Sequence, residues 1–113
     1  MCKEDTLRMI LEDVLRYAKS ELGDLLNSVI LYGSYARGDY DKESDIDVMI
    51  IADITSDEVK KQIKKFSDFS VEIDLKYGVV LSLLIQDKAT YERYKATYAL
   101  FKNIEAEGVD LCA

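Results

Sequence analysis

The sequence predicts an α/β (α+β) fold in which helices flank one small mixed β-sheet. Two apolar patterns alternate along the chain: helical stripes that repeat every three to four residues, and short runs rich in β-branched residues. The 113 residues can bury one modest core, and they contain no repeat, linker or low-complexity stretch. We therefore expect residues 1–113 to form a single domain.

The first helix is expected to begin at Asp5 or Thr6, because either side chain can cap a helix, and to stop at Gly23. Its apolar stripe comprises Leu7, Ile10, Leu11, Val14, Leu15, Ala18 and Leu22. Two strands follow, at Val29–Tyr32 and Asp45–Ile51, and a tight turn or a single helical turn separates them.

A long second helix is expected to begin at Thr55 or Ser56 and to end at Gly78. One face of this helix carries Val59, Ile63, Phe66, Ile73 and Tyr77. The apolar run Val79–Ile85 is interpreted as a third strand that is buried on both faces. A last helix over about Thr90–Glu107 completes the order α-β-β-α-β-α.

Asp45 and Asp47 are the candidate metal ligands. Side chains alternate across a strand, so the two carboxylates project from one face with their Cα atoms roughly 6 to 7 Å apart. Mg²⁺ takes one or two protein carboxylates and fills its other positions with water and phosphate oxygens. The pair therefore suits a divalent cation that binds together with a nucleoside triphosphate.

Gly33 and Ser34 are the candidate phosphate-binding residues. Glycine lets the backbone approach a phosphate closely, and Ser34 offers a hydroxyl and N–H groups at the start of a short helix. The anion and cation sites would then face each other across one β-turn-β unit. The alternative is an acidic surface hairpin without a ligand.

The run GSYARGDYDKESDID resembles the motif GSxARGxxxxxSDxD of the minimal nucleotidyltransferases in the DNA polymerase β superfamily. The matching residues are Gly33, Ser34, Ala36, Arg37, Gly38, Ser44, Asp45 and Asp47. This resemblance implies a polymerase β-like nucleotidyltransferase fold, with ATP as substrate and Mg²⁺ or Mn²⁺ as cofactor. It also implies that Asp45 and Asp47 are catalytic and bind metal, and that the nucleotide is bound by Gly33, Ser34, Arg37 and Ser44.

Two of these residues have a second, structural interpretation. Arg37 either neutralises phosphate charge or pairs with an acid of the turn (Asp39, Asp41 or Asp45), and the structural role is slightly favoured. Ser44 is also suited to a turn or to the entry of the second strand.

A third carboxylate is missing from the expected place. Proteins with this motif usually carry an Asp or Glu on the next strand, where it binds metal and deprotonates the attacking hydroxyl. The run VVLSLLI has Ser82 as its only polar residue, so we expect no third carboxylate, with Asp74 and then Asp87 as alternatives. Slow catalysis, or nucleotide binding without turnover, would follow because one of the two metal positions is weakened.

The acceptor is expected to come from a partner, because the chain has no further domain to bind one. Minimal nucleotidyltransferases of this kind are often antitoxins whose companion is a helical HEPN ribonuclease. The resemblance therefore implies transfer of AMP to a tyrosine of a HEPN-type toxin. The alternatives are a binding antitoxin or scaffold with a weak or inactive site, and a homodimeric enzyme that modifies a small molecule.

Two side-chain clusters have a structural and a functional interpretation each. An aromatic stripe in the last helix either packs on the protein's own sheet, which is favoured, or meets a partner or a second copy; it comprises Tyr91, Tyr94, Tyr98 and Phe101. A basic cluster in the second helix either is a solvated face, which is favoured, or meets a phosphate-rich ligand; it comprises Lys60, Lys61, Lys64 and Lys65.

Composition excludes several classes of protein. The net charge of −7 argues against a broad nucleic-acid interface. Cys2 and Cys112 lie at the two ends without paired spacing, so neither a disulfide nor a zinc site is expected. No apolar run approaches the roughly 18 residues of a membrane span, and we expect a cytoplasmic protein.

Overall fold

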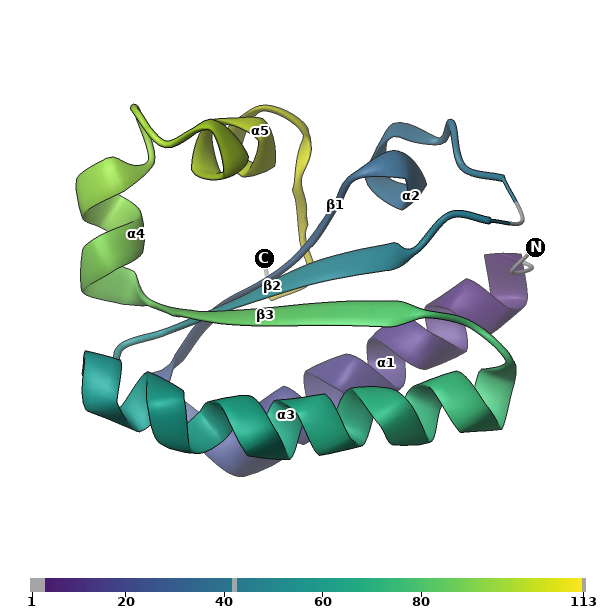
Figure 1. Ribbon diagram of the computed structural model, residues 1–113, viewed down its shortest axis with the longest axis horizontal. Coiled ribbons are helices and arrows are strands. Elements are labelled where there is room, and N and C mark those ends of the chain that lie inside the picture. The colour runs from purple at the N-terminus through teal and green to yellow at the C-terminus, as the bar shows by residue number, and fades with distance from the viewer. Residues whose placement is uncertain (1–3, 42, 113) are drawn as a thin grey trace.

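A computed structural model describes residues 4–41 and 43–112. Within these residues the sheet has four strands in the order β3-β2-β1-β4. The elements in chain order are α1 (Glu4–Leu22), the 3₁₀ turn η1 (Gly23–Leu25), β1 (Leu26–Tyr32), α2 (Ser34–Arg37), β2 (Ile46–Ala52), α3 (Ser56–Tyr77), β3 (Leu81–Asp87), α4 (Lys88–Tyr94), α5 (Ala99–Glu107) and β4 (Val109–Asp110). Figure 1 shows helices on both faces of this sheet.

The sheet is mixed, which confirms the predicted fold class. β1 pairs antiparallel with β2 and with β4, whereas β2 and β3 run parallel. Side chains alternate between the two faces of β2, so Val48 and Ile50 pack in the core on one face, and Met49 and Ile51 pack in the core on the other. Asp47 follows the same alternation and belongs to the face of Met49.

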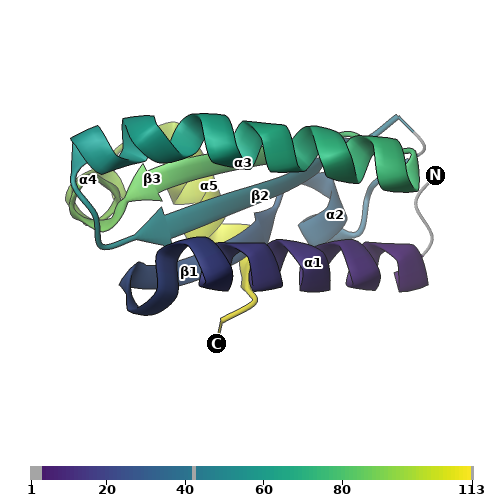
Figure 2. The same cartoon turned by 90° about the horizontal axis from the view of Figure 1, so that it is seen from below.

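Helices α1 and α3 cover one face of the sheet side by side (Figure 2). Tyr17 of α1 stacks on Phe69 of α3 with ring centroids 4.1 Å apart. The two helices are also joined by a hydrogen bond of 2.7 Å, in which the hydroxyl of Tyr77 donates to the carboxylate of Asp13. Thr55 caps α3 as predicted, because its hydroxyl accepts a hydrogen bond from the N–H of Glu58.

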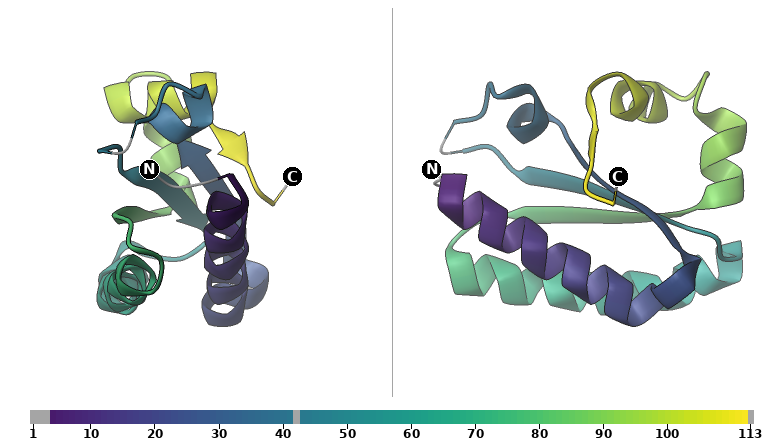
Figure 3. Two further views of the ribbon diagram at one scale, coloured as in Figure 1. Left: turned by 90° about the vertical axis from the view of Figure 1, so that its right-hand side faces the viewer. Right: turned by 180° about the vertical axis from the view of Figure 1, so that it is seen from behind.

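Helices α2, α4 and α5 lie on the opposite side of the sheet from α1 and α3 (Figures 1 and 3). Tyr91 of α4 and Phe101 of α5 are buried against Met49 and Ile51 of β2. The hydroxyl of Tyr91 also donates a hydrogen bond of 2.6 Å to Glu105. The second face of the sheet is therefore closed by a pair of short helices that are joined to each other.

The prediction of one continuous last helix is wrong. The chain leaves the helix after Tyr94, and the N–H groups of Thr97 and Tyr98 both donate to the carbonyl of Tyr94 to form a turn. The turn lets the two aromatic side chains, Tyr91 and Phe101, reach the same face of the sheet from separate helices. Glycine and proline are absent from this segment, so the sequence carried no signal for the break. The two-residue strand β4 was not predicted either.

Two predictions of burial are also wrong. β3 is an edge strand of the sheet, so it is not buried on both faces, and Leu84 is 40% exposed. Ile63, expected on the buried face of α3, is 51% exposed, because the helix turns Gln62 toward the interior instead. The helical stripe was assigned one residue out of phase at that turn.

Two other expectations concerned a membrane-spanning segment and the two cysteines. Among residues 4–41 and 43–112, no helix is long and apolar enough to cross a bilayer. Cys112 is a free, exposed thiol, and Cys2 lies outside the described residues.

Candidate active site

Asp47 lies near the start of β2 on the sheet face that carries α2 and α5. It is half-buried, it pairs across the antiparallel ladder with Tyr32 of β1, and it lies beside Ser82 in the parallel ladder with β3. Asp45 is exposed and precedes the strand by one residue. The two carboxylates are therefore brought close together, as the alternation along the chain predicts.

Gly33 brings the turn after β1 into direct contact with Asp47. Its φ of 75° is in the left-handed region that favours glycine. A Cβ atom at this position would lie 2.5 Å from Oδ2 of Asp47. A side chain at residue 33 would therefore be strained by the backbone and would force the Asp47 carboxylate to move, and α2 begins immediately afterwards at Ser34. The candidate phosphate-binding turn and the candidate metal ligand thus belong to one site.

The electrostatic environment of Asp47 favours a bound cation. Burial raises the pKa of Asp47, the charge of Asp45 raises it further, and the charge of Arg37 lowers it. Burial also raises the pKa of Tyr32 to about 12, with a contribution from the charge of Asp47. Among the described residues, neither Asp45 nor Asp47 forms a salt bridge, so their negative charge is not neutralised by a paired side chain.

Arg37 is held by two carboxylates at the end of α2. Its Nε donates to Asp39 over 3.1 Å, and its Nη1 donates to Glu107 of α5 over 2.9 Å. Asp39 was one of the acids expected to pair with Arg37. Glu107 was missed, because the 70 residues between the two positions leave no signal in the local sequence.

Ser44 belongs to a turn that leads into β2. Its hydroxyl accepts a hydrogen bond from the N–H of Asp41 over 2.9 Å and donates to the carboxylate of Asp41 over 3.3 Å. The N–H of Glu43 donates to the same carboxylate. The structure therefore gives Ser44 a local role at the turn that positions Asp45.

The position next to Asp47 on β3 is occupied by Ser82 and not by an acid. Asp74 is on α3, which covers the opposite face, and its Oδ1 accepts a hydrogen bond from the N–H of Leu81. Asp87 is at the far end of β3, where it caps α4 by accepting from the N–H of Thr90. Within the described residues, no three His, Cys, Asp or Glu side chains are grouped to hold a metal ion.

Asp45 and Asp47 nevertheless suit one divalent cation. Mg²⁺ or Mn²⁺ needs oxygen ligands, and one or two protein carboxylates suffice when water and phosphate oxygens complete the coordination. The unneutralised pair of carboxylates, with the raised pKa of Asp47, is the observation that supports this fit. Ligands for a second, nucleophile-activating ion are not grouped in the described part of the chain.

The aromatic stripe is divided by the break between α4 and α5. Tyr91 and Phe101 are buried in the protein's own core, whereas Tyr94 and Tyr98 are 44% and 55% exposed. A surface cavity of about 360 Å³ lies between the two helices; it is lined by Gln86, Thr90, Tyr94, Tyr98 and Phe101.

The basic cluster on α3 lies on a solvated face, as favoured. Three of its lysines have acidic partners: Lys61 pairs with Glu58, Lys64 with Asp68, and Lys65 with Glu21. These pairs are exposed, so each contributes little to stability.

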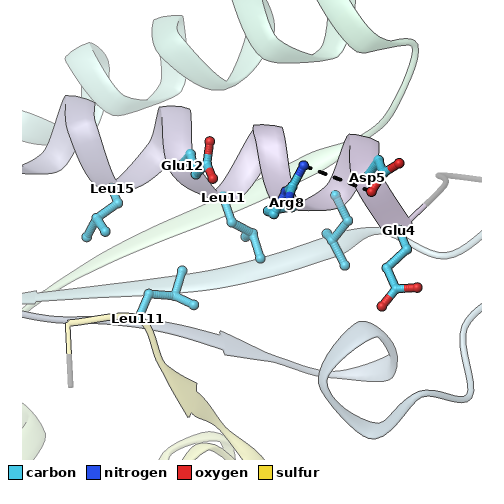
Figure 4. Close-up of a pocket in the computed structure, with 8 residues that line it drawn as sticks. Glu4, Asp5, Arg8, Leu11, Glu12, Leu15 and Leu111 are labelled. Carbon is cyan, nitrogen blue, oxygen red and sulfur yellow. Dashed lines mark ion pairs between the residues drawn. The ribbon is translucent and has the colours of Figure 1, made fainter.

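A separate groove of about 500 Å³ runs between α1 and the segment after β4 (Figure 4). Leucines form its apolar wall, and Glu4, Asp5 and Glu12 make its rim acidic. Its described lining residues do not include those of the candidate active site.

Comparison with protein families and curated proteins points to one activity. A family model described as "Nucleotidyltransferase domain" matches residues 9–106. The chain is 33% identical over 98 residues to "Putative protein adenylyltransferase MJ0604" of Methanocaldococcus jannaschii, a match that covers 87% of this chain and 90% of the relative. A second relative from the same organism, "Putative protein adenylyltransferase MJ0141", is 43% identical over 81 residues, which cover 70% of this chain and 78% of the relative.

Solved structures support the fold. A nucleotidyltransferase structure from Sulfolobus solfataricus superposes with a TM-score of 0.60 at 21% identity, and the match covers 90% of this chain and 76% of that one. A toxin-antitoxin structure with AMP-PNP superposes with a TM-score of 0.57 at 18% identity, covering 88% of this chain and 71% of that one. At these identities the likeness concerns the fold alone.

Proposed function

Because the chain belongs to the nucleotidyltransferase domain family, we propose that it transfers AMP from ATP to a hydroxyl of a partner protein. The proposed partner is a HEPN-type toxin, the proposed cofactor is Mg²⁺ or Mn²⁺, and the proposed location is the cytoplasm. The single observation that carries the proposal is the contact between Gly33 and Asp47, which joins a phosphate-binding turn to an unneutralised pair of carboxylates.

The reaction is an in-line displacement at the α-phosphorus of ATP. The oxygen of the acceptor hydroxyl forms a bond to the α-phosphorus, the bond to the bridging oxygen of the β-phosphate breaks, and pyrophosphate leaves. Because the position beside Asp47 on β3 is Ser82, the proton of the hydroxyl passes to solvent. A divalent cation, when bound, supplies the charge neutralisation that lets the triphosphate lie beside two carboxylates.

Each proposed site residue has a physical task. Asp45 and Asp47 bind the cation, and the lack of a side chain at Gly33 lets the phosphate-binding turn lie directly against the Asp47 carboxylate. Ser34 offers a hydroxyl to the β- or γ-phosphate. Arg37 contributes positive charge beside the same site, because its charge acts on Asp47.

Two observations support a protein as the acceptor. The curated relatives carry the name protein adenylyltransferase, and one solved neighbour is a toxin-antitoxin complex. On this chain, Tyr94 and Tyr98 are exposed beside a cavity on the sheet face that also carries Asp47. Exposed tyrosines are enriched at protein interfaces, so we assign the partner to this α4–α5 surface.

A second candidate function is neutralisation of the partner by contact, with a weak or inactive nucleotide site. The observation that favours it is Ser82, which occupies the position next to Asp47 where a third carboxylate would act. In that case the partner would bind tightly with or without nucleotide.

The deciding experiment is incubation of the purified chain with α-labelled ATP and Mg²⁺, alone and with the product of the adjacent gene. Label on the partner, identified by peptide mass, is the result expected of adenylyl transfer. Formation of a tight, unlabelled complex that is insensitive to ATP would instead establish the contact mechanism.

The double variant Asp45→Asn, Asp47→Asn is the control for this experiment. It should lose metal-dependent transfer, because it removes both cation ligands, while its thermal unfolding stays cooperative, because neither side chain belongs to the apolar core. Transfer at the rate of the unmodified protein would exclude both carboxylates from the mechanism.

A further inference from the structure

We propose that Glu107 is a positioning residue that pairs with Arg37, competes with the triphosphate for it and thereby lowers the affinity for ATP. This inference rests on the proposed function, because it concerns the same nucleotide site. Glu107 is at the end of α5, and Arg37, whose side chain it would position, lies 70 residues earlier in the chain.

The backbone of Arg37 is fixed at the candidate phosphate-binding turn. Arg37 is the last residue of α2, its N–H donates to the carbonyl of Gly33 over 3.1 Å, and Gly38 ends the helix in the left-handed conformation. Because Gly33 also touches Asp47, the start of the Arg37 side chain is fixed relative to the carboxylates. Only the long side chain of Arg37 can therefore move from one binding partner to another.

The position of Glu107 is fixed by the residue that follows it. A Cβ atom on Gly108 would lie 2.5 Å from both the carbonyl oxygen of Ile104 and Cγ2 of Ile30, so the backbone packs directly on β1 at this point. The N–H of Gly108 donates to the carbonyl of Ile104 over 2.8 Å, and β4 then pairs with β1. The backbone that carries Glu107 is therefore held against the sheet.

Two of the three guanidinium nitrogens of Arg37 are paired with carboxylates in this arrangement. Nε is paired with Asp39 and Nη1 with Glu107, and both contacts are 3.1 Å or shorter. A guanidinium between two carboxylates is a weaker partner for phosphate than a free one, because its charge is already compensated.

The contact with Glu107 is weak enough to be exchanged. The Arg37 side chain is 44% exposed and the Glu107 side chain 28%, and ion pairs of this exposure contribute little to stability. A triphosphate can therefore displace Glu107 from Arg37. Breaking this ion pair costs free energy, so the dissociation constant of ATP is higher than it would be without Glu107.

The test is a double-mutant cycle measured by calorimetric titration with ATP and Mg²⁺ on the full chain. Glu107→Gln should lower the dissociation constant of ATP by about threefold to tenfold, since it removes the competing charge. The same substitution in an Arg37→Ala background should change the affinity by less than about twofold, because Arg37 is no longer present to be released. Glu107→Asp, which restores the carboxylate, should return the affinity toward that of the unmodified protein.

Glu105→Gln is the matched control, because Glu105 is on the same helix but is bonded to Tyr91 and not to Arg37. It should leave the dissociation constant of ATP unchanged. If Glu107→Gln leaves ATP affinity unchanged, or changes it equally with and without Arg37, the positioning role is refuted while the proposed function stands. If the unmodified protein does not bind ATP at all, both are refuted.

The expected kinetic signature is a change in KM for ATP without a change in kcat. A merely structural role for the Arg37–Glu107 pair would instead lower the unfolding temperature and leave the affinity of the folded protein unaltered. Measuring unfolding of Glu107→Gln beside its ATP affinity separates the two roles.

Discussion

At the scale of single residues, Gly33 does the most to shape the site. Its backbone conformation and its contact with Asp47 are separate constraints. Gly38 has a similar φ of 83° but would meet nothing within 4 Å if a Cβ were added. The two glycines therefore share a positive φ, but they differ in ψ, which is −156° at Gly33 and 8° at Gly38, and in the steric contact.

We predict that Gly33→Ala destabilises the protein more than Gly38→Ala does. Both variants should lose about 1 to 3 kcal/mol through the strained backbone. Gly33→Ala should lose more because its φ and ψ are nearly restricted to glycine and because its Cβ displaces the Asp47 carboxylate. Urea unfolding measures the difference, and equal losses for the two variants would contradict both contributions.

Ser82 lies beside Asp47 in the parallel ladder, at the position where a third carboxylate could act in the proposed transfer. We predict that Ser82→Asp, which adds a carboxylate beside Asp47, raises the rate of metal-dependent adenylyl transfer by about tenfold or more, because it supplies a base and a ligand. Ser82→Asn has nearly the same shape without the charge and should not raise the rate. Equal rates for the Asp and Asn variants would mean that a third carboxylate is not the limiting factor.

At the scale of elements, one of the polar links between α1 and α3 involves the carboxylate of Asp13. The hydrogen bond from Tyr77 holds the pKa of Asp13 below its usual value of 3.8, and Arg16 and Lys76 act in the same direction against the effect of burial. The folded protein thus favours the carboxylate more than the unfolded chain does. Its contribution to stability is complete above about pH 4 and is lost as the pH falls through the lower pKa of the folded state.

We predict that Asp13→Asn costs about 1 kcal/mol of unfolding free energy at neutral pH. The difference between the unmodified protein and the variant should shrink as the pH is lowered below 3.8, when Asp13 of the unfolded and then of the folded chain becomes protonated. Urea unfolding at a series of pH values measures this difference in unfolding free energy. Tyr77→Phe, which removes only the hydroxyl, should remove most of the pH dependence. A difference that is constant down to acid pH would contradict this account.

Some features of the helices could be predicted from the local sequence, and others could not. The periodicity of α1 and the cap at Thr55 were predictable, because each depends on residues within one turn of helix. The break between α4 and α5 was not, because the aromatic spacing of 91, 94, 98 and 101 is helical across the whole segment. Burial of Tyr91 and Phe101 on one sheet face overrides that local preference.

At the scale of the whole molecule, the two faces of the sheet differ: one is covered by the main apolar core, and the other carries the candidate site residues. α1 and α3 close one face with a large apolar core, whereas the other face carries Asp47, the turn at Gly33 and the exposed tyrosines of α4 and α5 (Figures 1 and 2). The proposed partner on α4 and α5 would therefore approach the same face as the proposed nucleotide.

The amino-acid sequence by itself determined the fold class, the family motif and the identity of the paired carboxylates. Those features depend on spacings of a few residues, such as the two-residue period that places Asp45 and Asp47 together. Only the tertiary structure decided that Ser82 lies beside Asp47, and that Glu107 holds Arg37. These contacts join residues 35 and 70 positions apart, and their register is determined by the packing of the sheet and helices, which no local pattern encodes.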